Sequence, residues 1–346
     1  MNRIGPLHCP RTLVLLRGVP VPFTLFVLIW MATCPPLSAT PAGKDEFVPE
    51  GAFAFELDVF REEQSLAFDR SGNLNQLIKI VIPDRSVRDE VKGDISRGVT
   101  DYHLGLTIGI RDSWNVVLQA PYRVLKQDST LTTSSTEQEE QDEVNALSSQ
   151  TLSGMGDLRV MTMFRPVFSD RNGFVWGYGL THPITGQTES RPGLFTLALR
   201  SPNPIARGFV HYTRYPRLER ARFDVRAELQ TGLPGSVEFD DGRTDVYRSG
   251  NGVQIEVGWF QEIGPVGAGI SLEEFRQGPS RLGGVSLSDP REETLVHARI
   301  GSGNLRALEE GPLALPFQVM LEFDRSLRGF NVPYSDGYTL SILFFF

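Results

Sequence analysis

Charged side chains alternate in sign along one short stretch of this chain of 346 residues. The stretch contains Arg222, Asp224, Arg226 and Glu228, which occupy every second position. Residues i and i+2 of a β-strand lie on the same face, so a strand here would bring these charges together on one side of a sheet. Two interpretations follow. The side chains form ion pairs that neutralise one another, or they line a polar channel that senses the charge of a solute.

Histidines are the side chains that would indicate hydrolysis. The Ser or Asp nucleophile of a hydrolase needs a positioned His, yet His103, His182, His211 and His297 stand beside no nucleophile motif, and the sequence contains no Gly-x-Ser-x-Gly. The acidic segment 238–245 does not have the spacing of a calcium-binding loop. The sequence therefore predicts a protein that is not an enzyme, with no catalytic residue, no cofactor and no metal site.

Alternating apolar residues indicate which elements would position the charges. Residues 338–346 read YTLSILFFF, with large apolar side chains at every second position. Residues 100–111 (TDYHLGLTIGIR) and 114–125 form a predicted hairpin, whose apolar face carries aromatic residues near both ends. Such rows suit lipid-facing strands with aromatic girdles at the two membrane interfaces.

We predict an all-β fold, namely a transmembrane antiparallel up-and-down β-barrel of about 12 strands (12–14). The higher number counts the apolar segments 77–82 and 194–199, which otherwise belong to the long loops 61–99 and 183–206. Residues 126–155 are polar and are expected to form a solvated loop. A soluble β-sandwich with a core-facing last strand is the rival fold. The predicted strands are 52–60, 100–111, 114–125, 156–165, 174–182, 207–215, 221–231, 252–262, 266–275, 292–301, 315–325 and 338–346.

The first residues have the features of an export signal. Arg3, Arg11 and Arg17 precede the apolar stretch 23–33, which is too short to span a bilayer. Both cysteines lie in this removable segment, so the mature chain would have neither a disulfide nor a thiolate site. Loss of the three arginines changes the formal net charge from -8 to -11. The expected organisation is a signal peptide over residues 1–39, a short periplasmic N-terminal segment over 40–50 and an outer-membrane β-barrel over 51–346.

The faces opposite the apolar rows carry mixed charges. If the apolar faces meet lipid, these opposite faces line the barrel interior. A barrel of this strand number is narrow compared with aqueous porins, which favours interior ion pairs over an open channel. The lumen-facing candidates are Asp101, His103, Arg111, Arg123, Asp157, Arg159, Arg222, Asp224, Arg226, Glu228, Glu256, His297, Arg299, Glu322 and Asp324.

Three glycine-containing segments carry a family resemblance. They read GDISRGVTDYHLGLTIGIRDSWNVVLQAPY, SGMGDLRVMTMFRP and LTHPITG, in this order, and a short closing strand follows them. The pattern resembles an uncharacterised family of Gram-negative outer-membrane β-barrel proteins, defined by a domain of unknown function, and more loosely the outer-membrane proteins of the phenol meta-pathway. The resemblance covers most of the mature chain. It implies a barrel in the outer membrane and assigns no catalytic residues.

The expected function is that of a passive pore or small-solute transport channel. The alternative is a structural or surface-exposed barrel with a closed lumen and no transport. The expected partners are outer-membrane lipid, the barrel-assembly machinery and small solutes. Nucleic acid is not expected, because an exported chain with a net negative charge would be repelled by phosphates.

Overall fold

The computed structural model describes residues 47–68, 71–76, 82–83, 90–133, 149–168, 172–184, 203–215, 221–238, 244–263, 266–286, 290–302 and 317–345. All of them belong to one compact unit, Pro36–Phe346, and its regular elements are β-strands. The expected signal peptide, residues 1–39, lies outside the described residues. No described residue belongs to a helix that is long and apolar enough to cross a membrane.

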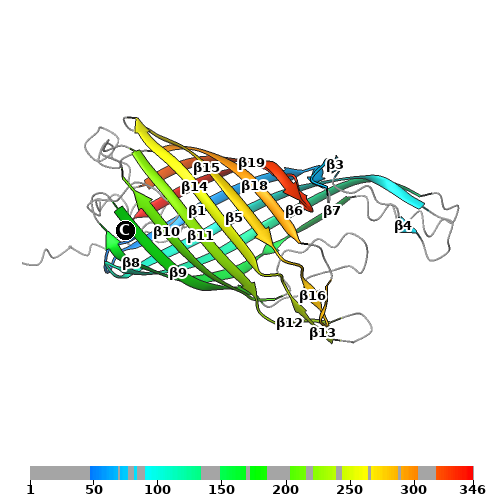
Figure 1. The fold of residues 1–346 in the computed structure, drawn as a ribbon, viewed down its shortest axis with the longest axis horizontal. Coiled ribbons are helices and arrows are strands. Elements are labelled where there is room, and N and C mark those ends of the chain that lie inside the picture. Colours follow the sequence, from blue (N-terminus) through cyan, green and yellow to red (C-terminus); the bar gives the residue numbers. More distant parts are fainter. Residues whose placement is uncertain are drawn as a thin grey trace, which may run out of the picture. The chain divides into compact units, whose positions relative to one another are not determined.

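Twelve antiparallel strands close into a barrel (Figure 1). The first strand, β1 (Phe53–Gln64), pairs on one side with the last strand, β21 (Asp336–Phe345), and on the other side with β5 (Glu90–Arg111). Strand β5 also pairs with β6 (Trp114–Thr133), and this pairing closes the ring. The other barrel strands are β8 (Asp157–Phe168), β9 (Asn172–Pro183), β10 (Ile205–Arg214), β11 (Ala221–Gly232), β14 (Gly252–Ile263), β15 (Val266–Gln277), β18 (Arg291–Ser302) and β19 (Phe317–Phe330).

This architecture confirms the predicted all-β barrel, and each predicted strand overlaps one strand of the ring. One sheet closes on itself, so the rival sandwich of two packed sheets is wrong. Closure pairs the backbone groups of both terminal strands, and this is what a sheet needs where water cannot satisfy an open edge.

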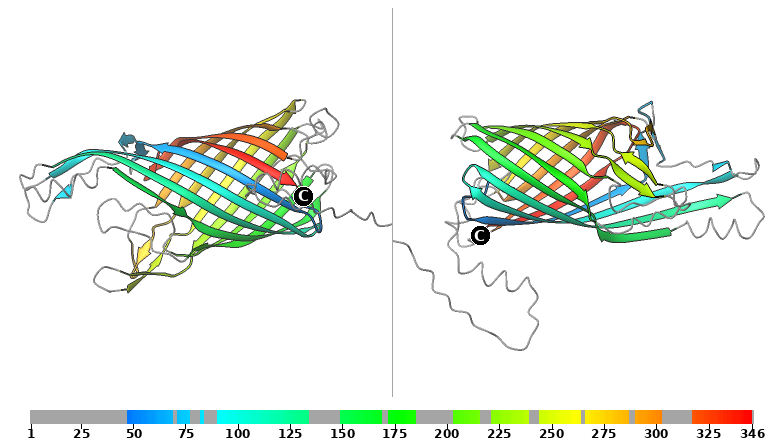
Figure 2. Two further views of the ribbon diagram at one scale, coloured as in Figure 1. Left: turned by 180° about the vertical axis from the view of Figure 1, so that it is seen from behind. Right: turned by 90° about the horizontal axis from the view of Figure 1, so that it is seen from below.

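The β5–β6 hairpin continues beyond the ring as a long ribbon (Figure 2). Its register runs from Arg111 opposite Trp114 at the turn to Val91 opposite Thr133 at the far end. Strand β7 (Ser149–Met155) pairs with Tyr122–Asp128 of β6, and β4 (Ile82–Pro83) pairs with the start of β5. The predicted loops 61–99 and 126–155 therefore contain strand residues at both ends, and the prediction of a loop is wrong there. A polar sequence does not prevent strand pairing where both faces of the ribbon can meet water.

Two small sheets form from the longer connections at the same end of the barrel. One contains β12 (Gly235–Glu238), β13 (Thr244–Arg248), β16 (Arg281–Leu282) and β17 (Val285–Ser286). The other contains β2 (Leu66–Phe68), β3 (Leu74–Gln76) and β20 (Val332–Pro333). Of the apolar segments that would raise the strand number to fourteen, residues 77–81 and 194–199 lie outside the described residues.

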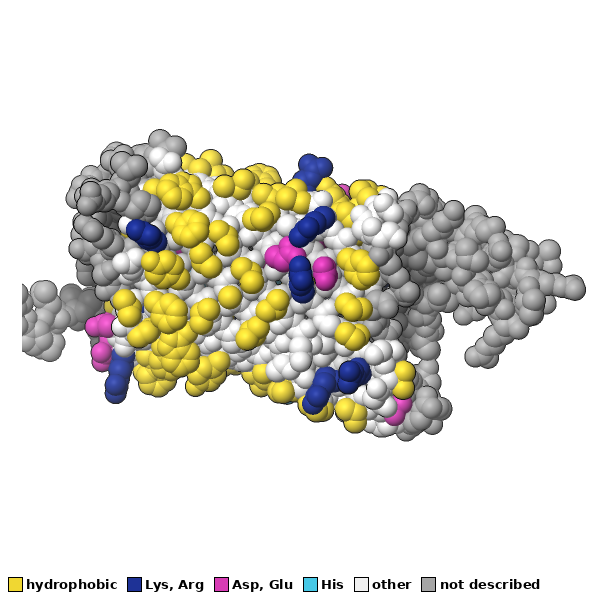
Figure 3. Space-filling view, viewed as in Figure 1, with side chains coloured by type: hydrophobic (Ala, Val, Ile, Leu, Met, Phe, Trp, Pro, Cys, Tyr) yellow, Lys and Arg dark blue, Asp and Glu magenta, His cyan; other side chains and the backbone are white. Residues whose placement is uncertain are grey.

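The outer wall is apolar, as the alternation predicts. On β5, Asp101 is 3% exposed whereas the adjacent Tyr102 is 42% exposed, so successive side chains point to opposite sides of the wall. Figure 3 shows hydrophobic side chains spread over one outer face of the barrel. The exposed apolar residues include Leu104, Val160, Leu180, Val210, Val257, Ile270, Leu272, Ile300, Phe323 and Leu340. Contiguous apolar surface on this scale marks contact with lipid or a partner.

We call the end of the barrel with the tight turn between Arg111 and Trp114 the short-turn end. Aromatic side chains gather where β6, β8 and β9 reach this end. Trp114 stacks on Phe164 with ring centroids 5.9 Å apart, and Phe164 stacks on Trp176 at 4.6 Å. The indole N–H of Trp114 donates to Thr162 Oγ1 at 2.7 Å. Rings with an apolar body and one polar contact suit a membrane interface.

Candidate functional site

The barrel interior contains a cavity of about 490 Å³. Inward side chains of β1, β5, β6, β8, β10, β11, β14, β19 and β21 surround it. Six carboxylates and three arginines are among these lining residues. The carboxylates outnumber the arginines and the single histidine of the lining together, so the described lining carries a net negative charge.

Glu228 lies at the centre of a group of arginines on one side of the cavity. Its Oε1 is 2.7 Å from Arg207 Nη1, and its Oε2 is 3.2 Å from Arg226 Nη2 and 3.8 Å from Arg159 Nη2. Glu228 is only 6% exposed. We call Arg159, Arg207, Arg226 and Glu228 the arginine cluster. Three guanidinium groups around one carboxylate leave this side of the cavity positively charged.

The next strands along the wall carry mainly carboxylates. Arg299 bridges two of them, because its Nη2 lies 2.6 Å from Glu256 Oε1 while its Nε donates to Glu322. Ser271 Oγ donates to the same Glu256 oxygen at 2.7 Å. Buried ions are tolerated when hydrogen bonds satisfy them in this way. We call Glu256, Glu273, Glu322 and Asp324 the acidic cluster.

Two further ion pairs occupy inward faces. Asp101 accepts two hydrogen bonds from Arg123, at 2.7 Å from Nε and 2.6 Å from Nη2, across the β5–β6 pair. His103 Nε2 lies 3.6 Å from the same carboxylate. On β11, Arg222 Nε donates to Asp224 at 2.6 Å. His211, on the neighbouring strand β10, places its Nε2 at 3.2 Å from the Asp224 carboxylate.

Residues that precede the first strand enter the short-turn end of the barrel. Phe47 packs in an apolar cluster with the inward side chains of Val117, Met161, Met163, Val175 and Phe209, and Arg165 lies over its ring at 4.6 Å. Val48 is 2% exposed and lines the cavity. The backbone is anchored where Gly51 N–H donates to Gly109 C=O at 2.9 Å. Residues 47–49 therefore narrow the interior at this end.

The structure brings most of the predicted lumen-facing candidates together. Asp101, His103, Arg159, Arg226, Glu228, Glu256 and Glu322 line the cavity. Arg123, Arg222, Asp224, His297, Arg299 and Asp324 form the inward ion pairs around it. Asp157 is half-buried on β8. Arg111 is exposed beside the β5–β6 turn, where the register shifts, and it is not among the cavity residues.

Three residues of the interior are not among the lumen-facing candidates predicted from the sequence. They are Arg207, Glu273 and Phe47, the residue that narrows the short-turn end. The first two stand at inward positions of predicted strands, so the same alternation could have found them. Phe47 belongs to no periodic pattern, because it lies before the first strand. Nothing in the local sequence indicates that this residue turns into the barrel.

Comparison with known proteins identifies the architecture. No family model and no curated protein matches the sequence. An outer-membrane channel from Pseudomonas putida F1 superimposes with a TM-score of 0.64 at 13% identity, over 89% of this chain and 100% of that one. The fold is that of an outer-membrane β-barrel. The NanC porin aligns with a TM-score of 0.42 at 10% identity, over 83% of this chain and 98% of the porin. The β-domain of the Bordetella autotransporter BrkA aligns with a TM-score of 0.44 at 9% identity, over 85% of this chain and 100% of that domain.

Proposed function

We propose that the protein is a passive channel through which small solutes cross the outer membrane. The observation that carries this proposal is the cavity of about 490 Å³ inside a closed barrel, with charged side chains on several sides. A barrel that serves only as a scaffold can fill its interior with packed side chains. Charged groups around an open space instead provide a polar path for ions and small polar solutes.

The charge of the lining indicates which solutes pass more easily. Six carboxylates and three arginines surround the cavity. Carboxylate-rich constrictions favour cations, because they attract them and repel anions. The proposed channel therefore prefers small cations, or polar solutes with a positive group, over anions.

Several features support residence in the outer membrane. The apolar outer wall suits lipid, and the predicted signal peptide over residues 1–39 would direct export. We further propose that the chain belongs to the uncharacterised family of Gram-negative outer-membrane barrels that its sequence resembles. Its partners would then be outer-membrane lipid, the barrel-assembly machinery and small solutes. The proposal includes no catalytic step.

A barrel with a closed lumen is the second candidate function. The observation that favours it is the apolar cluster around Phe47, which narrows the end of the interior next to the short turns. In this case the protein would be a structural or surface-exposed component of the membrane. Its cavity would be closed at one end by residues 47–49.

Conductance across a planar lipid bilayer distinguishes the two candidates. A channel gives discrete current steps after insertion of the folded protein, and the current is larger for cations. A closed barrel gives no current above background leak, although circular dichroism and heat-dependent gel mobility show that it is folded. Absence of steps from a folded, inserted protein would overturn the channel.

A further inference from the structure

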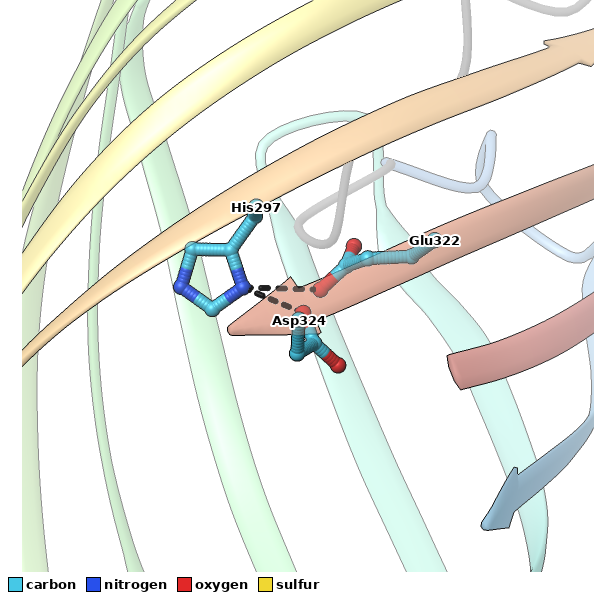
Figure 4. A group of neighbouring side chains, drawn as sticks. All are labelled: His297, Glu322 and Asp324. Carbon is cyan, nitrogen blue, oxygen red and sulfur yellow. Dashed lines mark hydrogen bonds and ion pairs between the residues drawn. The ribbon is translucent and has the colours of Figure 1, made fainter. Parts of the chain in front are cut away.

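One histidine and two carboxylates meet in the wall next to the cavity. His297 on β18 lies directly opposite Asp324 on β19, and Glu322 follows on the same inward face of β19. The imidazole Nδ1 is 2.5 Å from Asp324 Oδ1 and 3.4 Å from Glu322 Oε1. Figure 4 shows both carboxylates turned toward this ring nitrogen.

The surroundings of this group contain more negative than positive charge. Glu273, on the neighbouring strand β15, places Oε2 at 3.5 Å from His297 Nε2. Arg299 is the nearby guanidinium, and it is shared between Glu256 and Glu322. The acidic cluster thus sets four carboxylates against one arginine and one imidazole. Buried carboxylates are stable only when cations or donors compensate them.

We propose that His297, Glu322 and Asp324 bind one divalent transition-metal ion of the Zn²⁺ type. One donor atom from each residue, an imidazole nitrogen or a carboxylate oxygen, lies within 4.8 Å of the other two. An ion about 2.0–2.2 Å from each donor fits between atoms at this spacing after a small adjustment of the short His297–Asp324 contact.

The chemistry of the donors decides the class of ion. Imidazole nitrogen suits Zn²⁺ and its neighbours in the transition series, whereas Ca²⁺ needs about six to eight oxygen ligands. The hydrogen bond between His297 and Asp324 holds one proton between the two side chains, and a bound metal would replace that proton. Binding therefore releases protons and weakens at low pH.

An ion can reach the group from the barrel interior. Glu322 lines the cavity, while the side chains of His297 and Asp324 are 7% and 11% exposed behind it. A cation that enters the negatively charged cavity would meet Glu322 first. The inference concerns binding alone and does not require that solutes cross the barrel.

Calorimetric titration of ZnCl₂ into the folded protein tests the proposal. The protein is purified in detergent after treatment with a chelator, and gel mobility confirms that it is folded. We expect one ion per chain, with a heat that depends on the ionisation enthalpy of the buffer because protons are released. His297→Gln and Asp324→Asn should each weaken binding by about tenfold or more.

His182→Gln is the matched control, because His182 is an exposed histidine on β9, away from the acidic cluster. It should leave the affinity for Zn²⁺ unchanged. Equal binding by wild type and His297→Gln would overturn the proposal, and so would absence of saturable binding by the wild type. If the variants do not fold, electron paramagnetic resonance of the Cu²⁺-loaded wild type replaces them. Coupling to one imidazole nitrogen supports the site, and a spectrum without nitrogen coupling overturns it.

Discussion

Arg299 is the residue on which the charge balance of the acidic cluster depends. It is hydrogen-bonded to Glu256 and Glu322, and Glu322 is only 5% exposed. Arg299→Ala would leave both carboxylates without their shared cation. Removal of one partner from a buried ion pair costs about 3–5 kcal/mol, and we expect a loss of this size in the free energy of unfolding. Denaturant titration of the protein in lipid vesicles measures it.

The control for Arg299 is an exposed ion pair on the ribbon. Lys126 Nζ lies 2.8 Å from Asp128, and both side chains are more than half exposed. Lys126→Ala should change the unfolding free energy by less than about 1 kcal/mol, because water already solvates both ions. Similar losses for the two variants would mean that Arg299 is also well solvated.

Adjacent residues on β6 test which face of the wall meets lipid. Leu118 lies opposite Leu106 on the outer face, and Gln119 lines the cavity near Glu56. Leu118→Arg should cost about 2–4 kcal/mol if it lies near the bilayer midplane, because lipid cannot solvate the charge. Gln119→Arg should cost much less, because the new cation points into a negative, wet interior. Folding titrations into vesicles compare them, and equal losses would contradict a lipid-facing outer wall.

At the scale of the element, β5 can approach residues 47–49 closely because position 109 is a glycine. A Cβ at this position would lie 1.9 Å from Pro49 C=O. Gly109→Ala should therefore displace residues 47–49 from the short-turn end while the strand pairing of the barrel persists. Overpacking of this kind costs about 1–3 kcal/mol. In the proposed channel, the single-channel conductance should rise.

Gly98→Ala is the control for that change. Gly98 lies on the same strand, but a Cβ there would be 4.0 Å from the nearest atom, Lys126 C=O. It should alter neither stability nor conductance. A conductance that is unchanged in Gly109→Ala would show that residues 47–49 do not limit the current.

The strands illustrate what alternation in a sequence can reveal. Residues 100–111 alternate strictly, and a face that meets lipid must be apolar at every second position, so both the strand and its inward side chains could be predicted. The far end of the same strand, which begins at Glu90, could not be recognised. There the ribbon leaves the ring, both faces can be polar, and the hydrophobic pattern that indicates a strand is absent.

The register between neighbouring strands is the part of the site that one sequence does not determine. The alternation places His297 and Asp324 on inward faces, but it does not set the register of β18 against β19. That register brings them opposite each other and follows a bulge at Thr294/Leu295. A shift of one residue would separate them. The prediction of no metal site therefore rested on local spacing, which cannot detect ligands from different strands.

At the scale of the whole molecule, the interior divides into two arcs of opposite charge. The arginine cluster lies on β8, β10 and β11, and the acidic cluster lies on β14, β15 and β19. The lining carries more carboxylates than arginines. The proposed channel should therefore conduct cations better than anions, and the sign of the reversal potential in a salt gradient reports this preference.

Single charges in the lining should shift this preference in opposite directions. Glu56→Gln removes a negative charge and should lower the cation preference, whereas Arg207→Gln should raise it. A unit charge about 4 Å from an ion in water contributes about 1 kcal/mol, so each change should alter the permeability ratio by roughly fivefold at most. Glu63→Gln is the control, because Glu63 is 76% exposed outside the cavity. Shifts of the same sign in Glu56→Gln and Arg207→Gln would mean that current does not pass through the cavity, since ions in it must feel both charges.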